Sequence, residues 1–121
     1  MPDSVTFINH ATVLIQLNGT SILTDPVYSF SISYFLPRLK KPGIPFHQLP
    51  HIDVVLISHN HYDHLNLRTL RRLRRAFDPA IIVPQGVGNY AKRAAFRQIG
   101  ELRWWQEVIS ENVKITCVPA K

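Results

Sequence analysis

The chain has 121 residues, of which 45% are hydrophobic and 18% are charged. This length allows one domain with a hydrophobic core and is too short for two ordinary domains. The formal net charge of +6 favours anionic partners such as phosphate esters, nucleic acids or lipid headgroups. No apolar run approaches the roughly 20 residues that a membrane-spanning helix needs.

The first five residues lack a basic region followed by an apolar stretch, so the sequence predicts no secretory signal. Cys117 is the only cysteine, which excludes a disulfide within the chain and favours a reducing compartment. It lies in an apolar alternation, so we expect a buried structural thiol. A cytoplasmic protein, or one peripheral to a membrane, is therefore expected.

The N-terminal residues predict three strands. Residues 5–10 and 12–17 are rich in Val, Ile, Thr and Phe, which favour strands. Asn18-Gly19 predicts a tight hairpin turn, because both central positions of such a turn need positive φ. Residues 21–24 would return as the partner strand, and Pro26 would end it.

Residues 26–50 form a long segment with five prolines and several aromatic side chains. Loops of this length without regular structure are uncommon and are often functional. Two interpretations stay open: the segment packs onto the core, or it forms a substrate wall or a membrane-facing surface.

Residues 52–58 are almost continuously apolar and predict a strand that is buried on both faces. Asn66 could then cap a helix over residues 67–77. Leucines and a phenylalanine recur on one face at helical spacing, and five arginines cover the rest. A solvated helix face is the favoured interpretation of these arginines, and a nucleic-acid site is the alternative. Asp78-Pro79 would end the helix.

The C-terminal residues predict a strand over 80–83 and a second helix over 87–99, with Gly100 as its left-handed stop. Strands are expected over 102–105 and 113–118, joined by a turn around 110–112. This order of elements indicates an α/β layered domain.

The strongest functional signal is an H-x-H-x-D-H motif, residues 59–64, directly after the predicted strand 52–58. Imidazole and carboxylate groups are the donors that suit zinc and similar divalent ions. His59 and His61, two residues apart, can point the same way from extended backbone. Asp63 and His64 follow after the chain turns and can reach a second metal beside the first.

With three further segments, this motif resembles the metallo-β-lactamase superfamily. Residues 9–15 (NHATVLI), 23–26 (LTDP) and 102–105 (LRWW) are similar to an opening strand, a turn and a tryptophan-containing strand of that family. Together they resemble the branch that contains N-acyl-phosphatidylethanolamine-hydrolysing phospholipase D, with sugar-lactonase-like proteins as a more distant match. The resemblance covers nearly the whole chain.

The resemblance implies half of a four-layer αββα sandwich, a mixed sheet with helices on one face. It also implies two zinc ions, with other divalent metals as alternatives. The residues it assigns are His59 and His61 to the first zinc, Asp63 and His64 to the second, Asp25 as an orienting partner beneath the site, and His10 near the cleft.

The implied chemistry is hydrolysis by a hydroxide that the two metals share, with Asp63 as the catalytic residue that holds it in line. The expected substrate is a small-molecule or lipid phosphodiester. The alternatives are lactone or ester hydrolysis at the same site, and a non-catalytic module that binds an anionic membrane or, less favoured, nucleic acid.

This chain departs from the family pattern, because complete members supply a third histidine, a bridging aspartate and a last histidine. His10, His47 and His51 all lie upstream and match none of these. Residues 1–121 are therefore expected to be one partial domain, truncated at its C-terminus and inactive or nearly so alone. The uncovered sheet face would pair with the missing half or with a second copy.

Overall fold

The computed structural model describes residues 3–9, 12–26, 46–58 and 64–119. The elements in chain order are β1 (Ser4–Asn9), β2 (Thr12–Leu17), β3 (Thr20–Thr24), the 3₁₀ turn η1 (Phe46–Gln48), β4 (Val54–Leu56), α2 (His64–Phe77), β5 (Ala80–Pro84), α3 (Gly88–Arg93), β6 (Gln98–Leu102), β7 (Glu107–Ser110) and β8 (Val113–Thr116).

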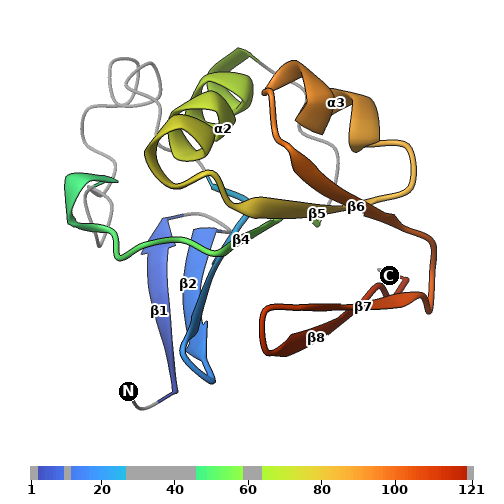
Figure 1. Ribbon diagram of the computed structural model, residues 1–121, viewed down its shortest axis with the longest axis horizontal. Helices are drawn as coiled ribbons and strands as arrows, with labels where there is room; N and C mark the ends of the chain where they lie inside the picture. The colour runs from blue at the N-terminus through green and yellow to red at the C-terminus, as the bar shows by residue number, and fades with distance from the viewer. Residues whose placement is uncertain (1–2, 10–11, 27–45, 59–63, 120–121) are drawn as a thin grey trace.

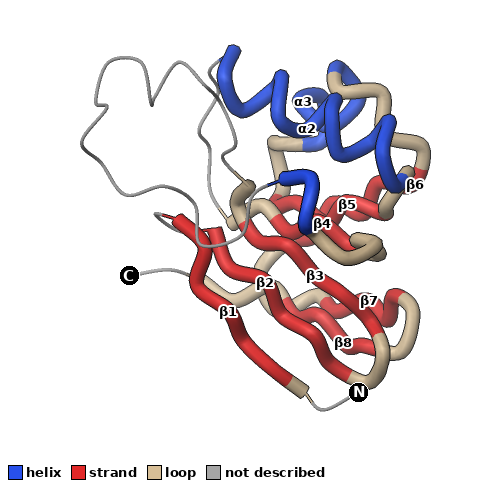
Figure 2. The backbone as a smooth tube through the Cα atoms, turned by 90° about the vertical axis from the view of Figure 1, so that its left-hand side faces the viewer, coloured by secondary structure: helices blue, strands red, loops and turns tan. Residues whose placement is uncertain are grey.

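Six strands form one mixed sheet in the order β1-β2-β3-β4-β5-β6, and β7 and β8 form a separate antiparallel pair. The β1–β2 and β2–β3 pairs are antiparallel, whereas β3 to β6 run parallel. Figures 1 and 2 show α2 and α3 on one face of the six-stranded sheet and the β7–β8 pair on the other. The predicted α/β class, with helices on one face of a mixed sheet, is confirmed.

The hairpin between β2 and β3 forms where the sequence predicts it. Asn18 and Gly19 both have positive φ, 53° and 79°, as a primed two-residue turn requires. The turn fixes the register of the two strands, with Leu17 opposite Thr20 and Leu14 opposite Leu23. Because side chains alternate along a strand, this register directs Leu14 and Leu23 together into the helix-covered core.

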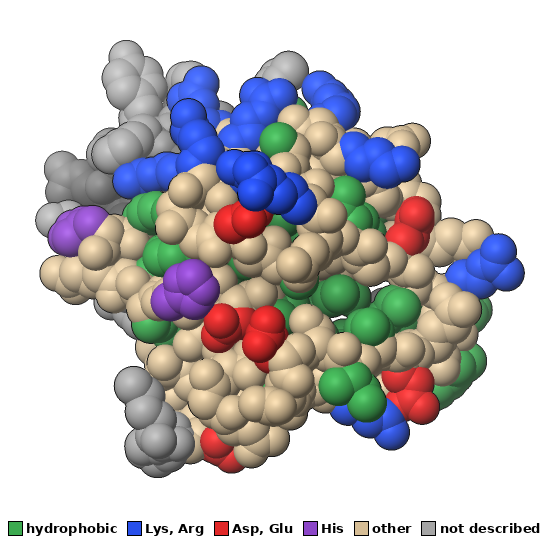
Figure 3. Space-filling model, viewed as in Figure 1, with side chains coloured by type: hydrophobic (Ala, Val, Ile, Leu, Met, Phe, Trp, Pro, Cys, Tyr) green, Lys and Arg blue, Asp and Glu red, His purple; other side chains and the backbone are tan. Residues whose placement is uncertain are grey.

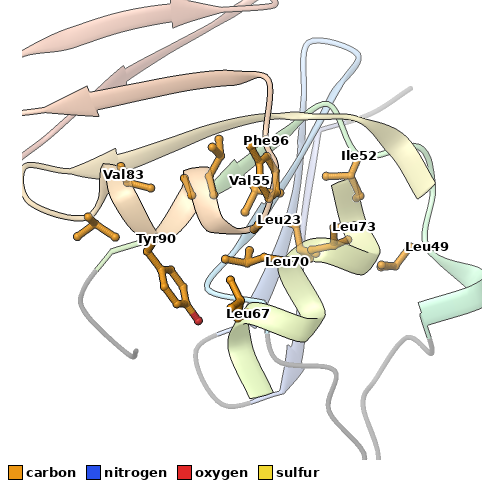
Figure 4. Close-up of a cluster of buried hydrophobic side chains, with 14 of the residues drawn as sticks. Leu23, Leu49, Ile52, Val55, Leu67, Leu70, Leu73, Val83, Tyr90 and Phe96 are labelled. Carbon is orange, nitrogen blue, oxygen red and sulfur yellow. The ribbon is translucent and has the colours of Figure 1, made fainter. Parts of the chain in front are cut away.

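The core beneath the helices is built by the apolar face of α2. Leu67, Leu70 and Leu73 are at most 4% exposed and pack with side chains from the sheet. Figure 4 shows these leucines beside Leu23 and Val55, which come from the central strands. The leucine spacing therefore fixes which side of α2 faces the sheet, and this orients the start of the helix relative to β4.

Two arginines of α2 hold the end of α3. The Arg71 guanidinium donates two hydrogen bonds to the Arg93 carbonyl oxygen, each at 3.3 Å, and Arg74 Nε donates to the Ala95 carbonyl oxygen at 3.1 Å. The last carbonyl groups of a helix have no partners within it and carry partial negative charge. The predicted solvated face of α2 thus includes cations that join the two helices.

The opposite face of the six-stranded sheet is only partly covered. Ile22, Val54 and Ile82 pack with Val113 from β8 in a second apolar cluster. Val5 and Phe7 of β1 are 72% and 65% exposed. The sheet therefore leaves apolar side chains uncovered at its β1 end, as the sequence predicts.

The predicted start of the first helix is wrong. α2 begins at His64, so Asn66 lies inside the helix and does not cap it. Leu67 is already buried in the second turn. The helix therefore begins inside the motif, and the preference of asparagine for a cap does not set its start.

The predicted second helix over residues 87–99 is also wrong in its second half. α3 ends at Arg93, Ala95 has a positive φ of 66°, and residues 98–102 form strand β6 instead. Gly100 pairs with Ile82 within the sheet, where a Cβ would lie 2.8 Å from Ile82 Cδ1. This glycine therefore serves a close approach in the sheet and does not stop a helix.

Three smaller expectations near the C-terminus and in β4 need correction. The predicted strand 102–105 ends at Leu102, and Trp104 and Trp105 lie exposed in the turn before β7. The predicted strand 52–58 forms ladder pairs only over residues 54–56. Cys117 is half-buried and not fully buried. These predictions rested on hydrophobicity alone. The ends of a strand are set by its hydrogen bonds to neighbouring strands, which hydrophobicity does not reveal.

We predict that Arg74→Met lowers the free energy of unfolding by about 1–2 kcal/mol. The change removes the charged group of α2 that donates to the Ala95 carbonyl oxygen, just after α3, and it keeps the alkyl part of the side chain. Arg75→Met is the matched control, since Arg75 is exposed and makes neither contact with α3 described above. Urea unfolding of both variants measures the difference. Equal stabilities of the two variants would show that the contact between the helices contributes nothing.

Candidate functional site

The candidate site lies at the carboxyl ends of the parallel strands. The loop with the H-x-H-x-D-H motif connects the end of β4 to the start of α2, as the sequence predicts. His10, His59, His61 and Asp63 fall outside the described residues, and for His64 only the helical backbone is described. The structure thus describes the two residues that flank the loop, Ser58 and His64, whereas the arrangement of the donor groups stays a prediction.

The residue that anchors this loop is Asp25, directly after β3. Its Oδ1 accepts a hydrogen bond from the Ser58 backbone N–H at 2.8 Å, and its Oδ2 accepts one from the Ser58 hydroxyl at 2.6 Å. Ser58 immediately precedes His59. The carboxylate therefore fixes the backbone at the entry to the motif, whereas the predicted role of Asp25 in orienting a metal ligand stays a prediction.

Asp25 is itself held by both neighbouring strands. Its backbone N–H donates to the Leu56 carbonyl oxygen at 2.7 Å, and its carbonyl oxygen accepts from the Thr12 hydroxyl at 2.7 Å. Its φ of 40° lies in the left-handed region, which aspartate tolerates better than most residues. Contacts on three sides fix this turn and hold the carboxylate in place.

A pocket of about 240 Å³ opens beside this anchor. Asp25 and Ser58 contribute to one part of its wall, and apolar side chains such as Leu56, Leu102 and Ile115 form much of the remainder. The pocket lies between the six-stranded sheet and β8, and its wall includes Ser58, the residue that precedes the motif. Apolar walls with a few polar groups at one end are common in sites that bind small molecules.

A second loop at the same edge is held in a similar way. Glu101 of β6 accepts hydrogen bonds from the backbone N–H of Gly86 at 2.6 Å and of Gly88 at 3.3 Å. Gly86 and Gly88 lie between β5 and the first turn of α3. The loop that follows β5 is thus fixed by a carboxylate from the neighbouring strand, as the loop that follows β4 is.

The described histidines outside the motif lie elsewhere. His51 precedes β4, at the amino end of that strand, where its Nε2 is 3.6 Å from Asp53 Oδ1 and its ring meets Phe77 edge-on. His47 is exposed in η1. Among the residues that the structure describes, no group of three or more His, Cys, Asp or Glu side chains gathers at one point.

Sequence reasoning missed Ser58, Thr12 and Glu101 as residues that shape this edge. Ser58 could have been found, because a serine between a buried strand and a histidine motif can donate through both its backbone and its hydroxyl. Thr12 could have been found from the predicted hairpin, whose register places Val13 opposite Thr24 and so Thr12 beside Asp25. Glu101 acts across the β5–β6 pair, which no local signal marks.

Comparison with known proteins places these features in a family. The sequence model for the beta-lactamase superfamily domain matches residues 20–121. An uncharacterised protein of Mycobacterium tuberculosis is 36% identical over 124 residues, and N-acyl-phosphatidylethanolamine-hydrolyzing phospholipase D 1 of Caenorhabditis elegans is 32% identical over 131 residues. The matches cover 98% and 96% of this chain but only 33% and 36% of those proteins. The chain therefore spans about a third of the length of these relatives.

Solved structures show the same fold. The crystal structure of CmlA, a diiron β-hydroxylase from Streptomyces venezuelae, matches with a TM-score of 0.76 and 28% identity, over 98% of this chain and 24% of that one. An isothiocyanate hydrolase from Delia radicum gut bacteria matches with a TM-score of 0.57 and 23% identity, over 81% of this chain and 41% of that one. The second likeness concerns the fold alone. Among the described residues, no helix has the length and apolar character needed to cross a bilayer.

We predict that Asp25→Gly lowers the free energy of unfolding by about 3 kcal/mol, because both Ser58 donors lose a charged acceptor. Glycine keeps the left-handed backbone without strain. Asp25→Asn should cost only about 1 kcal/mol, since the amide can still pair with both groups of Ser58. Hydrogen exchange at the Ser58 amide, measured by NMR, should accelerate strongly in the glycine variant.

Asp3→Gly is the control for that experiment. Asp3 is also an acceptor for a backbone N–H, that of Asn18 at 3.1 Å, but it is exposed at the end of the chain. Unchanged exchange at Ser58 in Asp25→Gly, or equal losses of stability at positions 3 and 25, would contradict the anchoring role.

Proposed function

The chain belongs to the β-lactamase superfamily, and we propose that it forms the metal-binding part of a metal-dependent hydrolase. The observation that carries this proposal is the pair of hydrogen bonds from Ser58 to Asp25. These bonds fix the backbone next to a loop in which three histidines and an aspartate fall within six residues. A loop anchored on a sheet can direct several donors at one point, which an unanchored loop cannot do without a larger loss of entropy.

The donor set fits a divalent metal. The motif supplies imidazole nitrogens from His59, His61 and His64 and carboxylate oxygens from Asp63, the ligand types that zinc, iron and manganese accept in proteins. Asp25 is not counted as a donor, because both of its carboxylate oxygens accept hydrogen bonds from Ser58. When bound, such a metal supplies Lewis acidity and lowers the pKa of water to near neutrality.

The residues of this chain would then share the remaining tasks. His59 and His61 would hold one metal, and Asp63 and His64 a second metal beside it. Asp63 would also orient the attacking water, as the catalytic residue. Asp25 would act through Ser58 as a positioning residue, since it sets where the motif loop begins.

For the substrate, we propose a phosphodiester, with a phospholipid or a related small molecule as the natural form. The support is the likeness to relatives that are named as N-acyl-phosphatidylethanolamine-hydrolysing phospholipases D, one from C. elegans and a mitochondrial one from Saccharomyces cerevisiae. Ester or lactone hydrolysis is the rival, because it needs the same activated water and the same Lewis acid. Zinc is the proposed metal, and iron is the rival because of the likeness to a diiron enzyme.

We predict that the purified chain binds Zn²⁺ and that His61→Ala weakens this binding by at least about tenfold, because it removes one of few donors. His47→Ala is the matched control, since His47 is an exposed histidine outside the motif. Isothermal titration with Zn²⁺, and then with Fe²⁺ under anaerobic conditions, measures the affinities. The same affinity in the His61→Ala variant and the unchanged chain would refute the metal site.

The substrate class can be tested without turnover. Mn²⁺ held by the motif should broaden the ³¹P resonance of diethyl phosphate, because a phosphodiester would lie next to the paramagnetic ion. The broadening should fall to the level of the metal-free chain in His61→Ala. Broadening of the carbonyl ¹³C resonance of a lactone probe in place of the ³¹P resonance would favour the rival substrate class.

Hydrolysis by the 121-residue chain is expected to stay near the uncatalysed rate, because the motif supplies only four donors for two metals.

A further inference from the structure

The excess of positive over negative charge in this protein lies in its helical layer, residues 64–97. Residues 64–97, which contain α2 and α3, hold eight lysines and arginines and one acidic residue, Asp78, a net charge of +7. The whole chain has a net charge of +6, so all other residues together are slightly acidic. The helices and the strands therefore differ in charge far more than the overall composition indicates.

Most of these cations reach solvent on the outer side of the helices. Seven of the eight are exposed and form what we call the basic surface: Arg68, Arg71, Arg72, Arg75, Lys92, Arg93 and Arg97. Figure 3 shows Lys and Arg side chains gathered over the region of α2 and α3, with few acidic side chains nearby. The hydrophobic side of α2 packs on the sheet, so this outer side is the one that the fold leaves toward solvent.

Several of these cations are held in place by the protein itself. The Arg71 guanidinium is bonded to the end of α3, and Arg72 lies over the Phe46 ring with its Cζ 3.9 Å from the centroid. Arg97 Nη1 is 3.5 Å from Asp78 Oδ2. Contacts with carbonyl groups and a ring do not neutralise a guanidinium group, so these arginines keep their formal charge. The basic surface thus has a positive electrostatic potential, and contacts with the protein hold several of its charges in place.

We propose that the basic surface docks the protein onto an anionic phospholipid bilayer. A bilayer attracts cations through the field of many lipid headgroups, so it needs no free pair of guanidinium N–H groups at each arginine. All cations of the helical layer contribute to this electrostatic attraction, including arginines such as Arg71 and Arg72 that contact other groups of the protein. Because α2 begins directly after the motif loop, docking through this helix would bring that loop near the headgroups.

The same observations disfavour nucleic acid as the partner. Single-stranded nucleic acid is held by aromatic side chains that stack on bases. In the described part of the chain, the exposed large hydrophobic residues lie in β1, in the turn before β7, in β7 and after β8, not on the helices. Recognition of duplex bases uses amide and hydroxyl side chains on a helix as well as arginine. On α2 the exposed polar side chains from residue 67 onward are all arginines.

The test is vesicle co-sedimentation of the purified chain. Binding is expected to vesicles of phosphatidylcholine with 30% phosphatidylglycerol at low salt, and not to pure phosphatidylcholine. Arg68→Gln combined with Arg75→Gln should reduce the partition coefficient roughly 30-fold, because each cation near an anionic surface contributes about a fivefold factor. Both arginines are exposed and take part in none of the contacts above, so circular dichroism should show an unchanged fold.

Arg103→Gln combined with Lys114→Gln is the matched control, because it removes two cations that lie outside the helical layer. It should weaken binding less than about threefold. Three results would overturn the proposal: equal loss of binding in the two double variants, equal binding to neutral and anionic vesicles, or tighter binding to a 20-nucleotide single-stranded or duplex DNA than to the anionic vesicles. None of these measurements requires metal or turnover, so they are independent of the hydrolase proposal.

Discussion

The two hydrogen bonds between Asp25 and Ser58 are the contact on which the candidate site depends. They join the residue after β3 to the second residue after β4, at the point where the chain enters the motif loop. The parallel register of β3 and β4, with Thr24 opposite Leu56, brings these two residues to the same edge. The left-handed backbone at Asp25 then directs its carboxylate toward Ser58. Strand pairing, turn conformation and a charged acceptor thus combine to fix one short segment of backbone, and the proposed metal chemistry requires such a fixed segment.

Much of the fold could be predicted from the sequence, because local patterns specify it. The Asn18-Gly19 turn, the leucine face of α2 and the place of the motif between a strand and a helix all follow from spacing and residue type. The resemblance to the metallo-β-lactamase superfamily is confirmed by the family match over residues 20–121. The errors fell where tertiary pairing overrides local preference. Ile99 pairs with Ile81 in the sheet, although its neighbours favour a helix, and no local pattern reveals that pairing.

The functional site was predictable to a smaller extent than the fold. The donor residues that we propose stand out as a cluster in the sequence, and Asp25 was proposed as a partner of the site because its segment resembles a family turn. Their supports were not found, because a hydrogen bond such as that from Thr12 to Asp25 joins residues from different elements. The distribution of charge is a further property that composition conceals. A net charge of +6 gives no indication that the excess of cations lies in the helical layer and that some of these cations join its two helices.

The contact between Glu101 and Gly88 limits which residues can occupy these two positions. A Cβ at position 88 would lie 2.7 Å from Glu101 Oε1, so a larger residue there would require the Glu101 carboxylate to shift. With a short side chain at position 101, that restriction on position 88 would disappear. The side chains at positions 88 and 101 therefore compete for the same space, so the residue at one position limits the size of the residue that fits at the other.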